Sequence, residues 1–316
     1  MSDQNFADRL LGAIADKKTP LIVGLDPVYQ NLPAAIVQHK EMNDDEDLEA
    51  GVDAILEFCT RILKVVAPHV PAVKINSAFF EQYHWYGIEA FHAVVQEAAA
   101  HDLIVINDAK RADIGNSSER YAIATLADPE FTGGGGLDDT VGPDAVTVNP
   151  YMGSDSVSPF IKTAHDFNKG LFILVRTSNP GAAEIQDQLL LDGTPLYQHV
   201  GRLVAKWGAG MIGEKGYSSV GAVVGATNPQ QLGTLRELLP QTLFLVPGYG
   251  AQGATAADVV RAFKPDGTGA IINSSRGIIY AHKSPQYANM GWEKAVEQSV
   301  LAAKKEIAGA LGARSM

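Results

Sequence analysis

The chain has 316 residues, of which 46% are hydrophobic and 19% are charged, and this is the composition of a globular protein with a large core. Its formal net charge of −11 at pH 7 argues against nucleic acid or an anionic membrane as the main partner, because both attract basic surfaces. The single cysteine, Cys59, excludes a disulfide within the chain, and neither an apolar signal segment nor a run of about 18 apolar residues occurs. We therefore expect a cytoplasmic protein with no membrane partner.

Eight short apolar runs recur along the chain. Ahead of the first run, residues 5–17 carry apolar side chains at helical spacing and predict a short amphipathic helix. The runs are rich in Val, Ile, Leu and Ala without strict alternation, which is typical of buried parallel strands. We expect these strands at residues 21–25, 72–76, 104–111, 145–150, 171–175, 220–224, 243–246 and 270–273.

Segments of helical length separate the predicted strands. The clearest helices are expected over residues 48–67, 78–101, 196–207 and 291–311. Residues 128–143 contain four consecutive glycines between acidic residues, and we interpret them as an insertion, because a phosphate-binding loop avoids acids. Eight alternating strand and helix units predict a (β/α)8 TIM barrel, built as a single α/β domain over residues 1–316. A doubly wound open sheet is the alternative, but no Gly-x-Gly-x-x-Gly motif follows the first strand.

Polar side chains follow most of the predicted strands. In a (β/α)8 barrel the carboxyl ends of the strands converge on one mouth, where active sites form. The residues expected at this mouth are Asp26, Lys74, Asp108, Lys110, Asn149, Ser178, Gln252 and Arg276. Their shared position at strand ends, rather than any one of them, indicates a functional site.

The third strand ends in a run of charged residues. Because strand side chains alternate, Asp108 and Lys110 should leave the same side of the backbone and share one site. Asp113 follows beyond the strand, where it could face Lys110 or point outward to another subunit. Two structural explanations remain open: a surface ion pair contributing under about 1 kcal/mol, and an acid in the first turn of the next helix.

The loops after the last two strands favour a phosphorylated substrate. Gly248, Gly250 and Gly253 would leave backbone N–H groups accessible to a phosphate. Gln252 adds an amide donor, and Arg276 can bind a dianion through two hydrogen bonds. The alternative is that the glycines only serve turns and the arginine lies on the rim.

The spacing of potential metal ligands argues against a metal site. The eight histidines form no His-x-His or His-Glu-x-x-His motif, and the acids at the strand ends are matched by lysines. No nucleotide-cofactor motif occurs either. The chemistry is therefore expected from lysine and aspartate side chains, with no metal and no cofactor.

Five segments combine these charged residues and glycines at characteristic spacings. They are Val73-Lys74, Asp108 to Gly115, Arg176 to Pro180, Val246 to Gly253 and Ile272 to Gly277. Together they resemble the orotidine 5′-phosphate decarboxylase family, and most closely its longer bacterial branch, over about Leu21 to Tyr280. Ala112 departs from this branch, where glycine is more common, and residues 128–143 have no catalytic counterpart.

The resemblance implies conversion of orotidine 5′-monophosphate to uridine 5′-monophosphate (UMP) and carbon dioxide, the last step of de novo UMP synthesis, without metal or cofactor. It implies that Lys110 protonates the carbon that loses carbon dioxide, that Asp108 lies against the substrate carboxylate, and that Asp113 comes from the partner subunit of a homodimer. Lys74 would be both catalytic and substrate-binding. The implied substrate-binding residues are Asp26 and Lys74 at the ribose, Ser178 at the pyrimidine amide edge, Asn179, Pro247 and Gly248, and Tyr249, Gln252 and Arg276 at the phosphate.

Three other functions remain open from the sequence. A Mg²⁺-dependent sugar-phosphate decarboxylase or aldolase of related barrel type can carry the same Asp-x-Lys-x-x-Asp element. A Schiff-base aldolase acting through Lys74 is disfavoured, since nearby acids should raise the pKa of this lysine. A non-catalytic phosphate-binding barrel would keep Arg276 but would have no use for the Asp-Lys-Asp set.

Overall fold

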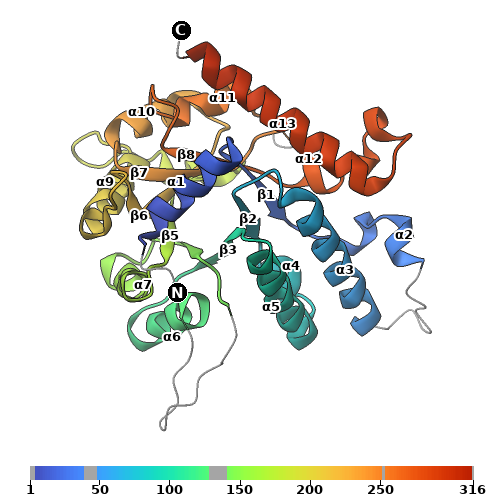
Figure 1. The fold of residues 1–316 in the computed structure, drawn as a ribbon. Helices are drawn as coiled ribbons and strands as arrows, with labels where there is room; N and C mark the ends of the chain where they lie inside the picture. The colour runs from blue at the N-terminus through green and yellow to red at the C-terminus, as the bar shows by residue number, and fades with distance from the viewer. Residues whose placement is uncertain (1–3, 39–47, 128–140, 251–252, 315–316) are drawn as a thin grey trace.

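The computed structural model describes residues 4–38, 48–127, 141–250 and 253–314 (Figure 1). Eight strands close into a barrel in the order β1-β2-β3-β4-β5-β6-β7-β8, and every neighbouring pair, including β1 with β8, is parallel. The strands are β1 Leu21–Leu25, β2 Ala72–Ile75, β3 Ile104–Arg111, β4 Ala145–Val148, β5 Gly170–Arg176, β6 Ser218–Val224, β7 Thr242–Val246 and β8 Ala270–Ser274. The predicted (β/α)8 TIM barrel is therefore confirmed.

Helices surround the barrel on the outside (Figure 1). The longer helices are α1 Phe6–Lys17, α3 Leu48–Val66, α5 His84–Ala100, α6 Gly115–Leu126, α7 Ser154–Asp166, α9 Leu196–Trp207, α10 Pro229–Leu238 and α13 Trp292–Arg314. Short helices are α2 Ala34–Val37, α4 Ala78–Glu81, α8 Ala183–Gln186, α11 Ala256–Val259 and α12 Arg276–Ile279. No helix in the described ranges is long and apolar enough to span a membrane.

The N-terminal helix α1 closes the end of the barrel at which the strands begin. Asn5 caps this helix, because its side-chain oxygen accepts a hydrogen bond from the Ala7 N–H at 2.8 Å. Phe6 packs edge-on against Phe172 of β5, with 6.1 Å between ring centroids, and Gly170 provides the space for the Phe6 ring. Apolar side chains of α1 and of the strands thus fill the interior at this end of the barrel, and the polar side chains lie at the opposite end.

A second apolar layer lies between the strands and the outer helices. It includes Cys59 of α3, which is fully buried, and burial raises the pKa of its thiol. The lone cysteine is therefore a core residue.

The prediction of one helix over residues 78–101 is wrong, because the segment forms α4 and α5. α5 begins at His84, which has a left-handed φ of 57° and therefore breaks the helical path. Gly87 allows the two pieces to pack closely, since a Cβ at this position would lie 1.8 Å from the Phe80 carbonyl oxygen. The helix is therefore broken by a close approach of the backbone at Gly87, which the spacing of apolar residues does not predict.

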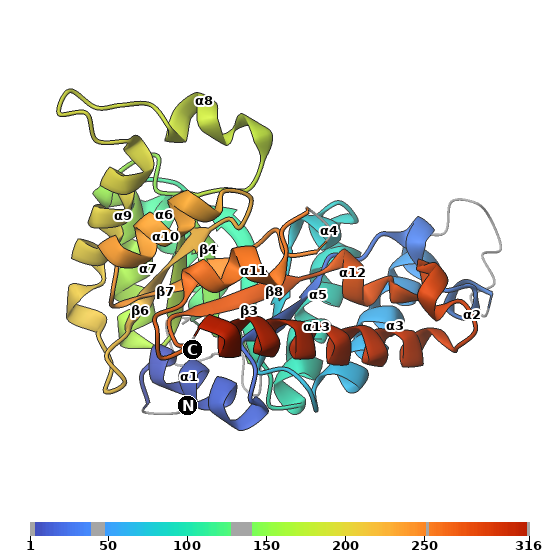
Figure 2. The ribbon, with the colours of Figure 1, turned by 90° about the horizontal axis from the view of Figure 1, so that it is seen from above.

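Residues 180–195, between β5 and α9, leave the barrel as an arm. They contain α8 and an isolated bridge between Leu189 and Pro195. Figure 2 shows the arm above the barrel, on the side opposite α1. This arm was not predicted from the sequence, and most of the predicted insertion at 128–143 lies outside the described residues.

Candidate active site

A cavity of about 530 Å³ opens at the carboxyl ends of the strands. Ten of the sequence-predicted site residues line it: Asp26, Lys74, Asp108, Lys110, Ser178, Asn179, Pro247, Gly248, Tyr249 and Arg276. They come from the ends of β1, β2, β3, β5, β7 and β8, so residues far apart in the sequence meet at one place. Gln252 lies outside the described residues.

Two lysines flank one buried carboxylate at the floor of the cavity. Lys74 Nζ lies 2.7 Å from Asp108 Oδ2, and Lys110 Nζ lies 2.7 Å from Asp108 Oδ1. The side chains of Lys74 and Asp108 are 7% and 10% exposed, whereas that of Lys110 is 46% exposed. Lys110 is therefore the member of this triad that a bound molecule can reach most easily.

Charge pairing decides the protonation states of the two buried members. Burial opposes ionisation of Asp108, but the positive charges of Lys74 and Lys110 outweigh it and hold the pKa of this carboxyl well below its usual range. Burial likewise opposes protonation of Lys74, but Asp108 and Asp26 outweigh it and raise the pKa of this lysine. Lys74 is thus an ammonium at neutral pH, which agrees with the argument against a Schiff-base nucleophile.

Asp26 stands beside Lys74 with a free acceptor. Its Oδ1 lies 3.6 Å from Lys74 Nζ, and this buried oxygen receives no hydrogen bond from any described residue. A buried acceptor of this kind is costly unless a donor arrives, so the position suits a hydroxyl group of a ligand.

Asp113 does not line the cavity of its own chain, within the part of the molecule that the structure describes. It follows β3, and its Oδ1 accepts a hydrogen bond from the Ile114 N–H at 2.8 Å. Nearby apolar side chains are exposed: Ile114 after β3, Tyr121 on α6, and Tyr151 and Met152 after β4.

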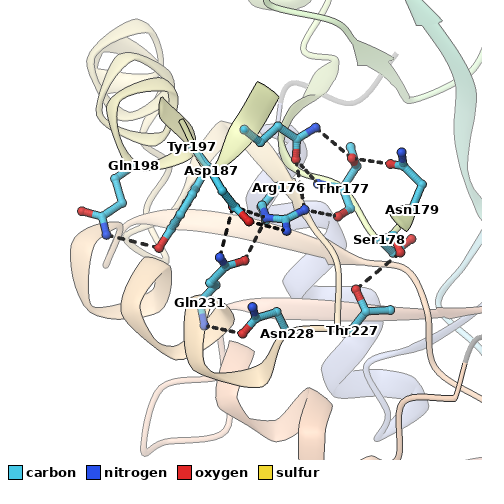
Figure 3. Close-up of polar contacts among 11 residues, drawn as sticks. Arg176, Thr177, Ser178, Asn179, Asp187, Tyr197, Gln198, Thr227, Asn228 and Gln231 are labelled. Atoms are coloured by element: carbon cyan, nitrogen blue, oxygen red, sulfur yellow. Dashed lines mark hydrogen bonds and ion pairs between the residues drawn. The ribbon is translucent and has the colours of Figure 1, made fainter. Parts of the chain in front are cut away.

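The loop after β5 brings Ser178 and Asn179 to the cavity (Figure 3). Gln186 of α8 holds the preceding Thr177 by two hydrogen bonds: its Oε1 accepts from the Thr177 N–H at 2.9 Å, and its Nε2 donates to Thr177 Oγ1 at 2.8 Å. The Thr177 hydroxyl in turn donates to Asn179 Oδ1 at 2.6 Å. The arm is thus tied to the segment that faces the cavity.

Arg176 at the end of β5 anchors the base of the arm (Figure 3). Its Nε lies 3.1 Å from Asp187 Oδ1 and donates to Gln231 Oε1 on α10 at 2.8 Å. Gln231 Nε2 donates to the same Asp187 oxygen at 3.1 Å. This three-residue cluster joins strand, arm and outer helix.

The loops after β7 and β8 form the remaining wall. Gly248 has a φ of 103°, a backbone conformation that favours glycine. Tyr249 lines the cavity, but its hydroxyl donates to Glu306 of α13 at 2.7 Å. Arg276 is exposed at the start of α12, where its guanidinium is accessible.

Some lining residues were not predicted from the sequence. They are Asn76, Leu174, Thr177, Gln186, Val223, Leu245, Asn273 and Ser275. Of these, Asn76 and Asn273 were detectable as polar residues at strand ends. Asn149, which was predicted at the mouth, instead stabilises its own loop, because its Oδ1 accepts from the Tyr151 N–H at 3.0 Å.

The donor groups at this site suit an organic anion better than a metal ion. Both oxygens of Asp108 are taken by lysines, and ammonium groups repel cations. Among the residues that the structure describes, no cluster of three or more His, Cys, Asp or Glu side chains could hold a metal.

The fold and the cavity define a (β/α)8-barrel enzyme whose mouth presents paired lysines, a buried carboxylate and an exposed arginine. The chain belongs to the orotidine 5′-phosphate decarboxylase / HUMPS family, whose sequence model matches residues 19–289. The resemblance noted from the motifs is therefore confirmed.

Individual relatives agree with this assignment. The chain is 40% identical to orotidine 5′-phosphate decarboxylase of Caldicellulosiruptor bescii, over 95% of this chain and 96% of the relative. It is 39% identical to the enzyme of the same name from Rhodopirellula baltica, over 96% and 99% of the two chains. The solved structure of Leishmania donovani OMP decarboxylase is 28% identical, covers 98% of this chain and 100% of its own, and superposes with a TM-score of 0.73.

Proposed function

We propose that this protein decarboxylates orotidine 5′-monophosphate to UMP and carbon dioxide, the last step of de novo UMP synthesis, without a metal or cofactor. The observation that carries the proposal is the Lys74–Asp108–Lys110 triad at the floor of the cavity. The names of the curated relatives support this reaction over a Mg²⁺-dependent sugar-phosphate decarboxylase or aldolase.

The reaction needs a fixed positive charge close to the carbon that loses carbon dioxide. The carbanion formed there lies in the plane of the ring, outside the π system, so it must be stabilised electrostatically. Lys110 supplies an accessible ammonium held 2.7 Å from Asp108, and we assign it as the counter-ion and proton donor. After the carbon–carbon bond has broken and carbon dioxide has left, the proton passes from Lys110 Nζ to this carbon.

Asp108 and Lys74 complete the charge set. The Asp108 carboxylate lies beside the departing carboxylate and adds stress to the bound substrate. Lys74 keeps Asp108 ionised and, with Asp26, holds the ribose; the free Oδ1 of Asp26 accepts from a ribose hydroxyl.

The loops bind the remainder of the substrate. Ser178, with Asn179 beside it, recognises the amide edge of the pyrimidine. The phosphate is held by Arg276 and Gln252, together with the loop formed by Pro247, Gly248 and Tyr249. The Tyr249 hydroxyl is already engaged by Glu306, so this residue contributes its backbone and ring. Enzymatic rate enhancements amount to roughly 8–23 kcal/mol, and binding energy from the phosphate supplements what one lysine can supply.

The decisive experiment is an assay of purified, EDTA-treated protein with orotidine 5′-monophosphate. Loss of the orotate absorbance with formation of UMP is expected, and added Mg²⁺ should not change the rate. Activity that disappears with EDTA and returns with Mg²⁺ would favour the metal-dependent alternative. No conversion under either condition would refute the proposal.

We further propose a cytoplasmic homodimer in which Asp113 enters the partner's site. The position of Asp113 outside its own cavity supports this, as do the exposed Ile114, Tyr121, Tyr151 and Met152 around it. The reducing cytoplasm is consistent with the buried Cys59.

Mixed dimers test the shared site. Lys110→Ala and Asp113→Ala homodimers should both be nearly inactive, whereas each mixed dimer would regain one intact site of two. Random exchange gives half mixed dimers, so about a quarter of wild-type activity should return. If native mass spectrometry detects mixed dimers and no activity returns, Asp113 serves its own chain.

A further inference from the structure

The strand that carries the charged triad is irregular where the triad lies. Asn107 of β3 pairs with Val146 of β4, and the next pair joins Arg111 to Val148. Three residues of β3 therefore lie opposite the single residue Thr147, where a regular parallel ladder would place one. This bulge contains both Asp108 and Lys110, so the strand ladder alone cannot fix their positions.

Lys110 adopts a backbone conformation that side-chain-bearing residues rarely adopt. Its φ is 50°, in the left-handed region, which costs about 1 kcal/mol or more for a residue other than glycine. Such a conformation persists only when surrounding contacts hold it.

One hydroxyl group contacts both Lys110 and Asp108 in the bulge. Thr147 Oγ1 accepts a hydrogen bond from the Lys110 backbone N–H at 2.9 Å and lies 3.0 Å from Asp108 Oδ1. Because the amide can only donate, the single proton of the hydroxyl is free for the carboxylate, and the direction of both bonds is fixed. Thr147 is 0% exposed and is not among the residues that line the cavity, so it acts through its neighbours.

We propose that Thr147 is a positioning residue: its hydroxyl holds the bulge of β3 so that the Lys110 ammonium and the Asp108 carboxylate face the reacting carbon. The expected effect on kcat rests on the proposed decarboxylation. The expected effect on the structure of the bulge rests on the hydrogen bonds alone. A valine at 147 keeps the shape and removes both bonds, whereas a serine keeps both bonds.

The experiment compares Thr147→Val and Thr147→Ser with Thr242→Val, a buried threonine at the start of β7, at the opposite end of the barrel. Thr147→Val should lower kcat about a hundredfold, the effect of displacing a catalytic group by about 1 Å, with KM within about threefold of wild type. Thr147→Ser should recover kcat to within about fivefold of wild type, and Thr242→Val should leave it unchanged. The melting temperature of each variant establishes that it is folded.

A second measurement keeps this test separate from the proposed function. Site-resolved hydrogen exchange of the Lys110 amide should be slow in wild type, Thr147→Ser and Thr242→Val, and at least about tenfold faster in Thr147→Val. If wild type does not decarboxylate the substrate, the function fails and the exchange result alone decides the role of Thr147. Equal exchange in all four proteins, or an active wild type with kcat of Thr147→Val within about twofold of it, would overturn the inference.

Discussion

The two sides of the cavity are built in different ways. On the β2–β4 side, Lys74, Asp108 and Thr147 are almost completely buried and are bound to one another by short polar contacts. On the opposite side, Asn179 and Arg276 are exposed and are carried by loops and helix starts. The barrel thus holds the buried charges (the barrel side), whereas loops and helix starts carry Asn179 and Arg276 (the loop side).

The largest effect is expected on the barrel side. Lys110→Ala should abolish turnover but leave UMP binding largely intact, because the ammonium acts on charge that develops only in the transition state. The measurements are kcat with orotidine 5′-monophosphate and the Kd for UMP. Activity within about tenfold of wild type would exclude Lys110 as the proton donor.

Arg276→Ala tests the loop side, where we expect a loss of substrate binding. We expect kcat/KM for the phosphorylated substrate to fall, with a loss of transition-state stabilisation of about 2–3 kcal/mol, because a charge-assisted hydrogen bond to the dianion is lost. Reaction of the unphosphorylated nucleoside should hardly change. Equal losses with both substrates would show that Arg276 is structural.

Much of the difference between the barrel side and the loop side of the cavity could be predicted from the sequence. Apolar runs predict strands because a sheet that is covered on both faces is apolar. The carboxyl ends of barrel strands meet at one mouth, so the polar residues that follow each run are expected there. Asp26 and Ser178 were located in this way, and Lys74 was located as a lysine near the end of an apolar strand.

Features that depend on departures from regular structure could not be predicted. Asp108 and Lys110 meet as predicted, but they do so through a bulge in β3 rather than by regular strand alternation, and this bulge was not predicted. The arm that carries Gln186 has no hydrophobic periodicity of its own, and the Tyr249 hydroxyl bonds to Glu306, 57 residues away. Such pairings follow from tertiary packing.

Lys74→Met tests whether the buried charges depend on one another for stability. Removing this ammonium leaves the negative charges of Asp26 and Asp108 less compensated and should reduce the free energy of unfolding by about 3 kcal/mol at pH 7.

In the wild type, the low pKa of Asp108 contributes stability above about pH 4 that is lost as pH falls through the folded-state pKa. The raised pKa of Lys74 contributes stability below about pH 10.4 that is lost as pH rises through its folded-state value.

Urea unfolding at pH 7 and pH 4 checks this prediction. The destabilisation should be smaller at pH 4, where protonation of the carboxylates relieves the unpaired charge. Lys162→Met, which removes an exposed lysine paired with Asp166, is the control and should change stability little. An equal loss at both pH values would contradict the electrostatic explanation.

The smallest effect is expected at the arm. Gln186→Ala removes two hydrogen bonds to Thr177 and should raise KM about fivefold, the equivalent of about 1 kcal/mol, with little change in kcat. Gln198→Ala on α9, which removes a bond to the Tyr197 hydroxyl, is the matched control (Figure 3). A drop in kcat without a change in KM would show that the arm takes part in the chemistry after all.

The central claim is that charges held by the barrel break a carbon–carbon bond and then protonate the carbon. It is tested most directly by running EDTA-treated protein with orotidine 5′-monophosphate in D₂O, with the Lys110→Ala variant in parallel. We predict one carbon dioxide per UMP and one deuterium at the ring carbon that carried the carboxylate, because the Lys110 ammonium exchanges with solvent. UMP without deuterium at this carbon, or equal product from the variant, would contradict the account.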